Sequence, residues 1–126
     1  MPSSERNTRA CSTRHLTEAS RADTVRNLND DFRSSLIGGR VMITPGVEGL
    51  GLMRVTEVLQ SVSSFSAFNS DNDPHGEHDF GALTCSGERL FWKIDYYDRE
   101  LDGGSEDPAD PGVTTRVLTI MLASEY

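Results

Sequence analysis

Apolar residues spaced three or four positions apart predict two helices in the first half of the chain. The first helix is expected over about residues 21–36, preceded by Ser20 as its N-cap, and the second over about residues 51–63. Their apolar stripes are Val25, Leu28, Phe32 and Leu36 in the first helix and Val55, Val58, Leu59 and Val62 in the second. Because each stripe needs a core to pack against, both helices are expected to cover a common sheet.

Alternating apolar and polar residues predict three strands. A short strand over residues 40–44 is expected to end in a Pro45-Gly46 turn. A β-hairpin is expected from strands at residues 80–85 and 89–97, joined across the glycine-containing segment 86–88. In the second hairpin strand Leu90, Trp92, Ile94 and Tyr96 share one face, which is the better candidate for the core.

The segment at residues 114–123 is β-branched and apolar on both faces. This pattern fits a central strand covered on both sides, and a buried helix is the open alternative because periodicity cannot separate the two over so short a run. The elements together predict an α+β fold: a three- or four-stranded, mainly antiparallel sheet with two helices packed on one face. A flexible N-terminal tail is expected over residues 1–19, and a single domain is expected over residues 20–126.

Composition narrows the class of protein without identifying it. The chain has 126 residues, of which 36% are hydrophobic, and no apolar run approaches the roughly 18–20 residues of a membrane span. No signal peptide is expected at the start, and the two cysteines do not suggest a disulfide framework. We therefore expect a cytoplasmic protein that does not bind membranes.

The negative charge is concentrated in one third of the chain. The formal net charge is −8, and residues 71–110 hold twelve Asp and Glu against Arg89, Lys93 and Arg99, a net of −9. Such a region disfavours direct binding to nucleic acid and suits a basic protein partner or a cation; a solvated surface that aids solubility is the plainer interpretation. The candidate interaction surface consists of Asp71, Asp73, Asp95, Asp98, Asp107 and Asp110.

Several longer stretches of the chain resemble a known family. They are Leu28-Asn29-Asp30, Gly38-Gly39-Arg40-Val41, Asp71 to Gly81, Phe91 to Asp98, Asp107 to Pro111 and Thr115 to Ala123. From about Thr24 onward the chain resembles an uncharacterised bacterial family, a domain of unknown function found in proteobacterial genomes and on their plasmids. The resemblance implies no activity; the plasmid association implies an accessory or anti-defence role, associated with a mobile element.

The loop from Asp71 to Gly81 carries the residues best suited to chemistry. His75, Glu77, His78 and Asp79 offer imidazole and carboxylate ligands of the kind that zinc, manganese or iron accept. A metal held there could activate water for hydrolysis. Pro74 and Gly76 indicate a loop, however, and the helical His-Glu-x-x-His pattern is absent.

Three other interpretations of this loop remain open. A calcium loop would use the carboxylates from Asp71 onward, but Ala82 stands where the bidentate glutamate is needed. A pair such as His78 with Asp95 could transfer protons, although no nucleophile accompanies it. The loop could also be a rigid connector built from Asx turns and glycines.

The sequence is therefore compatible with two functional hypotheses. The first is a small, cytoplasmic, non-enzymatic accessory protein that uses residues 71–110 to bind a basic partner, by imitating the charge of nucleic acid. The second is a divalent-metal-dependent hydrolase or nuclease centred on the loop from His75 to Asp79. The absence of a catalytic signature favours the first, and the sequence does not indicate an oligomeric state.

Overall fold

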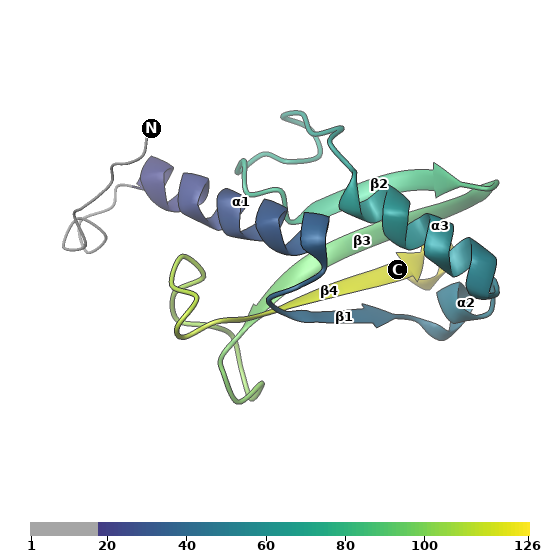
Figure 1. The fold of residues 1–126 in the computed structure, drawn as a ribbon. Helices are drawn as coiled ribbons and strands as arrows, with labels where there is room; N and C mark the ends of the chain where they lie inside the picture. The colour runs from purple at the N-terminus through teal and green to yellow at the C-terminus, as the bar shows by residue number, and fades with distance from the viewer. Residues whose placement is uncertain (1–17) are drawn as a thin grey trace.

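The computed structural model describes residues 18–126 and shows a four-stranded sheet with its two longer helices on one face (Figure 1). In chain order the elements are α1 (Glu18–Ser35), β1 (Arg40–Ile43), α2 (Pro45–Glu48), α3 (Leu52–Ser63), β2 (Phe80–Cys85), β3 (Glu88–Tyr97), β4 (Thr115–Leu122) and the 3-10 helix η3 (Ala123–Glu125). The predicted α+β fold is confirmed. Residues 1–17 of the predicted tail lie outside the described residues, whereas residues 18 and 19 already belong to α1.

The strands follow the order β1-β4-β3-β2, so β4 is central. β1 pairs in parallel with β4, and the other two pairings are antiparallel, which confirms a mainly antiparallel sheet. Residues on both faces of β4 are buried, including Leu118 on one face and Val117 on the other. This explains why the segment is apolar throughout and decides in favour of a strand over a buried helix.

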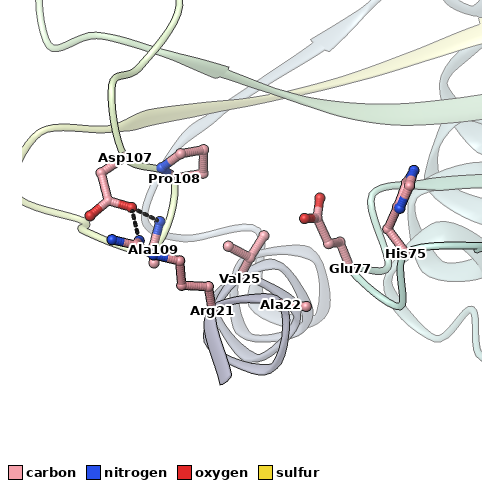
Figure 2. A pocket seen from close by; sticks show the side chains of 8 residues that line it. All are labelled: Arg21, Ala22, Val25, His75, Glu77, Asp107, Pro108 and Ala109. Atoms are coloured by element: carbon pink, nitrogen blue, oxygen red, sulfur yellow. Dashed lines mark hydrogen bonds and ion pairs between the residues drawn. The ribbon is translucent and has the colours of Figure 1, made fainter. Parts of the chain in front are cut away.

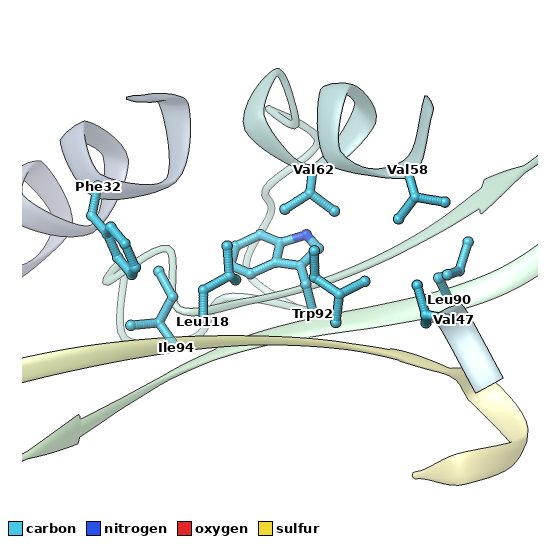
Figure 3. Packing of buried hydrophobic residues seen from close by; sticks show 9 residues of the cluster. Phe32, Val47, Val58, Val62, Leu90, Trp92, Ile94 and Leu118 are labelled. Carbon is cyan, nitrogen blue, oxygen red and sulfur yellow. The ribbon is translucent and has the colours of Figure 1, made fainter. Parts of the chain in front are cut away.

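Trp92 is the centre of the hydrophobic core. Its side chain is fully buried beneath the two long helices, among Phe32, Val58, Val62 and Leu118 (Figure 3). The core-facing side predicted for the hairpin is thereby confirmed. The backbone of Gly81 lies directly across from the indole, and a Cβ at this position would overlap Trp92 Nε1.

Two local predictions were wrong. Pro45 and Gly46 open the helix α2 instead of forming a turn, because Thr44 caps it by accepting a hydrogen bond from Val47 N and because proline suits the first helical position. This third helix places Val47 in the core with no exposed surface. Ser20 lies inside α1 and does not cap it; its carbonyl accepts a hydrogen bond from Thr24 Oγ1 at 3.0 Å.

No helix among residues 18–126 combines the length and the apolar character needed to cross a lipid bilayer.

Candidate binding site between two acidic loops

Two acidic loops meet at one end of the sheet, beside α1. The first acidic loop, residues 64–79, leads from α3 into β2, and the second acidic loop, residues 98–114, joins β3 to β4 (Figure 1). They carry four and six Asp or Glu residues, respectively. They lie at the same end because β3 runs antiparallel to both β2 and β4, so the final part of β3 lies beside the first residues of both: Lys93 pairs with Phe80, and Tyr97 pairs with Thr115.

Helix α1 holds both loops by side-chain contacts. On one side Arg26 Nη1 donates a hydrogen bond to the carbonyl of Gly76 at 3.1 Å. On the other side Arg21 Nη1 forms an ion pair with Asp107 Oδ1 at 2.7 Å. One helix thus fixes the position of one acidic loop relative to the other.

Asn29 is the buried link between α1 and the sheet. It has no exposed surface, and its Nδ2 donates to the carbonyl of Glu77 at 2.9 Å and to Tyr96 Oη at 2.8 Å. Its Oδ1 accepts a hydrogen bond from Arg116 Nε at 2.7 Å. All its hydrogen-bonding atoms are therefore satisfied, as a buried amide requires.

Arg116 extends this network to the second acidic loop. Its guanidinium lies 5.2 Å from the centre of the Tyr96 ring, and Nη2 donates to the carbonyl of Pro108 at 2.6 Å. Burial lowers the pKa of Arg116 from its usual value, yet an arginine stays charged at any physiological pH. A buried positive charge thus sits beneath the acidic end and fixes the start of β4 to the loop.

Glu77 and Asp79 project to the hydroxyl of Tyr96. Tyr96 Oη lies 3.5 Å from Glu77 Oε1 and 3.4 Å from Asp79 Oδ2. Burial, and then the nearby charge of Asp79, raise the pKa of Glu77; burial also raises the pKa of Asp79 and that of Tyr96. Within residues 18–126 neither carboxylate forms an ion pair, so this carboxylate pair holds negative charge that a cation would stabilise.

A pocket of about 430 Å³ opens beside Glu77, between the two acidic loops. Figure 2 shows Glu77 and His75 on one side, the Arg21–Asp107 ion pair on the other, and Val25 of α1 between them. The remaining lining side chains are small or apolar: Ala22, Pro108 and Ala109. Apolar walls with a carboxylate at one side suit a side chain that has an aliphatic stem and a positive head group.

His78 serves a different purpose from the one expected of a metal ligand. Its ring stacks on Phe68 with the ring centres 3.7 Å apart. Nδ1 lies 2.9 Å from Asp30 Oδ1, and Nε2 lies 3.4 Å from Asp73 Oδ2. Both ring nitrogens therefore face carboxylates, and the ring anchors the first acidic loop to α1 and to the core.

The four predicted metal ligands do not form a ligand set. His75 and Glu77 line the pocket, His78 turns to Asp30 and Asp73, and Asp79 points to Tyr96. In the part of the chain that the structure describes, no three His, Cys, Asp or Glu side chains are placed to hold a metal ion. These residues do not fit zinc, manganese or iron as they stand, and metal binding here stays a prediction.

The residues named in the calcium and proton-transfer interpretations also contact other groups than those interpretations require. Asp73 Oδ1 accepts hydrogen bonds from the backbone N–H groups of Glu77 and His78, which makes Asp73 part of the loop's own framework and not a free calcium ligand. Asp95 pairs with Lys93 at 3.1 Å, so the His78–Asp95 pair does not form. The connector interpretation thus describes Asp73 and His78 well.

The predicted interaction surface contains residues with three different environments. Three of the aspartates lie beside a basic side chain: Asp73 beside His78, Asp95 beside Lys93 and Asp107 beside Arg21. Asp98 accepts a hydrogen bond from the backbone N–H of Asp102, and Asp110 accepts one from the backbone N–H of Gly112, so both stabilise their own loop. Asp71 is exposed. Three further exposed carboxylates of the second acidic loop, Glu100, Asp102 and Glu106, lie within the predicted region 71–110 but are not among the six aspartates predicted individually.

Asn29 and Arg33 are buried polar residues of α1 that the sequence did not predict to contact the loops. Both are buried, Arg33 with 4% exposure, and Arg33 donates to the carbonyls of Val62 and Phe65. A signal was present, since position 29 falls four residues after Val25 and three before Phe32, in the middle of the predicted apolar stripe.

The fold and the site thus define a small α+β domain whose loops form an acidic end around a pocket. A family model of proteins of unknown function, DUF3768, matches residues 43–125, the greater part of the chain, and the chain belongs to this family. No curated protein and no solved structure matches it. The match begins at Ile43, later than the resemblance from Thr24 predicted, so it includes the two loops but not α1.

Proposed function

We propose that the protein is a non-enzymatic interaction protein that binds a basic protein partner through its acidic end. The observation that carries the proposal is the joint fixation of the two acidic loops by α1, which places a carboxylate of each loop, Glu77 and Asp107, on opposite sides of one pocket. Loops of like charge repel each other when held together, and a partner rich in arginine or lysine relieves that repulsion.

The pocket gives this surface one defined contact. A guanidinium or ammonium group entering it would reach Glu77, which has no ion-pair partner among residues 18–126, while its stem would lie along Val25. The exposed Glu100, Asp102 and Glu106 would act at longer range and steer the partner toward the pocket. The same carboxylates disfavour nucleic acid and could occupy the phosphate-binding surface of a basic protein.

The proposal is tested with the full chain and a short arginine-rich peptide as the probe, by fluorescence anisotropy. The variant E100Q/D102N/E106Q removes three charges from the second acidic loop, and D31N/E48Q/E57Q removes three exposed charges elsewhere, so that both variants have the same net charge. If each loop contact contributes about 0.5 kcal/mol, the loop variant should bind about tenfold more weakly. The control variant should bind within about twofold of the wild type, since distant charges are screened.

Two results would overturn the proposal. One is a wild-type protein that does not bind the arginine-rich peptide at low salt. The other is an equal loss of affinity in both variants, which would show that only the net charge matters and that the acidic end has no special role.

A further inference from the structure

β1 is an edge strand whose outer side is available for pairing. It lies at the end of the strand order and, within residues 18–126, pairs with β4 only. Thr44 N donates to the carbonyl of Ile120 at 3.1 Å, and hydrogen bonds to one neighbour alternate along a strand. The backbone N–H and C=O groups of Val41 and Ile43 therefore point away from β4, to the open edge.

Exposed apolar side chains are concentrated around this edge. Five of the eight large hydrophobic residues that are exposed within residues 18–126 fall between positions 37 and 53. They are Ile37, Val41, Met42, Leu52 and Met53, with exposures of 77%, 36%, 55%, 83% and 81%. None of the eight belongs to β2, the opposite edge strand.

β1 also lacks the features that usually protect an edge. Proteins discourage edge pairing with prolines, bulges or several charges, and the four residues of β1 contain one charge, Arg40. The segment from 37 to 53 is electrically neutral, with Arg40 against Glu48, although the chain as a whole carries −8. The edge is thus a part of the surface where two copies of this acidic chain repel each other little.

We propose that β1 pairs in antiparallel fashion with β1 of a second copy, which joins the two sheets into one of eight strands. The strand is self-complementary: a two-fold axis at Met42 sets Val41 opposite Ile43 of the second copy, and both residues have outward-facing backbone groups. The two Met42 side chains then meet at the axis, about 4.5–5.5 Å apart at Cβ.

The charge distribution favours a second copy as the occupant. β1 begins at the end of the sheet that carries the acidic loops, because it runs parallel to β4 (Figure 1). An antiparallel pairing turns the second copy around, so the two acidic ends point in opposite directions and stay far apart. The inference does not depend on what the acidic loops bind.

Sedimentation velocity over a concentration series tests this arrangement on the full chain. The wild type should form a dimer within the range up to about 100 μM. Met42→Lys sets two like charges opposite each other at the axis and should raise the dissociation constant at least about tenfold. Leu101→Lys makes the same change of charge at an exposed apolar residue of the second acidic loop and should leave the dimer intact.

Hydrogen exchange identifies the interface itself. The amide protons of Val41 and Ile43 should exchange more slowly as the wild-type concentration rises, because pairing protects them. Trp92 fluorescence and the melting temperature confirm that the lysine variants are folded. A wild type that is monomeric throughout the range, a dimer that Met42→Lys does not weaken, or a dimer whose Val41 and Ile43 amides exchange freely would each overturn the proposal.

Discussion

Replacing Asn29 by alanine tests whether the buried polar network holds α1 against the acidic end. The substitution removes hydrogen bonds to the Glu77 carbonyl and to Tyr96 Oη, and it leaves the Nε of the buried Arg116 without its acceptor. Asn27 offers a matched control, because it lies on the same helix and is exposed. The two Asn→Ala changes have the same chemistry and differ only in what the side chain contacts.

The expected loss follows from the contacts. Two neutral hydrogen bonds contribute about 1 kcal/mol each and the bond from Arg116 about 1.5–3 kcal/mol. Alanine regains roughly 0.5 kcal/mol through its higher helix propensity. The free energy of unfolding should therefore fall by about 3–4.5 kcal/mol for Asn29→Ala, and it should rise slightly for Asn27→Ala.

Urea unfolding followed by Trp92 fluorescence measures this difference, since Trp92 is the only tryptophan and is fully buried. A loss of about 3 kcal/mol corresponds to a fall of roughly 10 °C in the melting temperature for a domain of this size. Tyr96→Phe removes one hydroxyl of the same network and should cost about 1 kcal/mol, so it reports on the network even where Asn29→Ala is too unstable to purify. The reasoning is refuted if Asn29→Ala and Asn27→Ala differ by less than about 1 kcal/mol.

Two further predictions concern the carboxylate pair and the core. The raised pKa of Glu77 means that the folded state binds the Glu77 proton more tightly than the unfolded state does. The ionised Glu77 carboxylate therefore lowers the free energy of unfolding at pH 7. This destabilisation disappears as the pH falls through the raised pKa to below the ordinary value of 4.5. Glu77→Gln should therefore stabilise the protein at pH 7, by less than about 1 kcal/mol because the side chain is only partly buried, and should not do so near pH 4; a gain independent of pH in thermal melts would contradict this. Gly81→Ala should lower the free energy of unfolding by about 1–3 kcal/mol, because its Cβ would overlap Trp92 Nε1. Gly103→Ala is the control and should be nearly neutral, since a Cβ there would meet no atom closer than 3.9 Å. Equal melting temperatures for the two variants would show that the core adapts to the extra methyl group.

The sequence predicted the elements well where burial and periodicity agree. The hairpin from β2 to β3 and the helix α3 follow simple apolar patterns, and the structure confirms them within one residue. The apolar character of both faces of β4 likewise predicted its central place in the sheet. In each case a repeating pattern and a single partner surface determine the outcome.

The candidate site was predicted less well, because it depends on contacts between distant residues. The ion pair of Arg21 with Asp107 spans 86 positions, and the hydrogen bond of Arg116 with Asn29 spans 87. No local pattern encodes such pairs. A polar residue such as Asn29 is also expected at the surface, and only its position in the apolar stripe indicates otherwise. His78 was predicted to be a ligand from its acidic neighbours in sequence, yet one of its two carboxylate partners, Asp30, comes from α1.

The attachment of both loops to α1 has a geometric consequence for recognition. Two short epitopes on separate flexible loops would each bind independently, and any basic chain could satisfy them. If the acidic end binds a basic partner as proposed, two loops fixed to one helix would act as a bivalent ligand of constant span, and the first contact would bring the second to a high effective concentration. Such a partner would be selected by the distance between its basic groups as well as by their number, and α1, which lies outside the family match, would determine that distance.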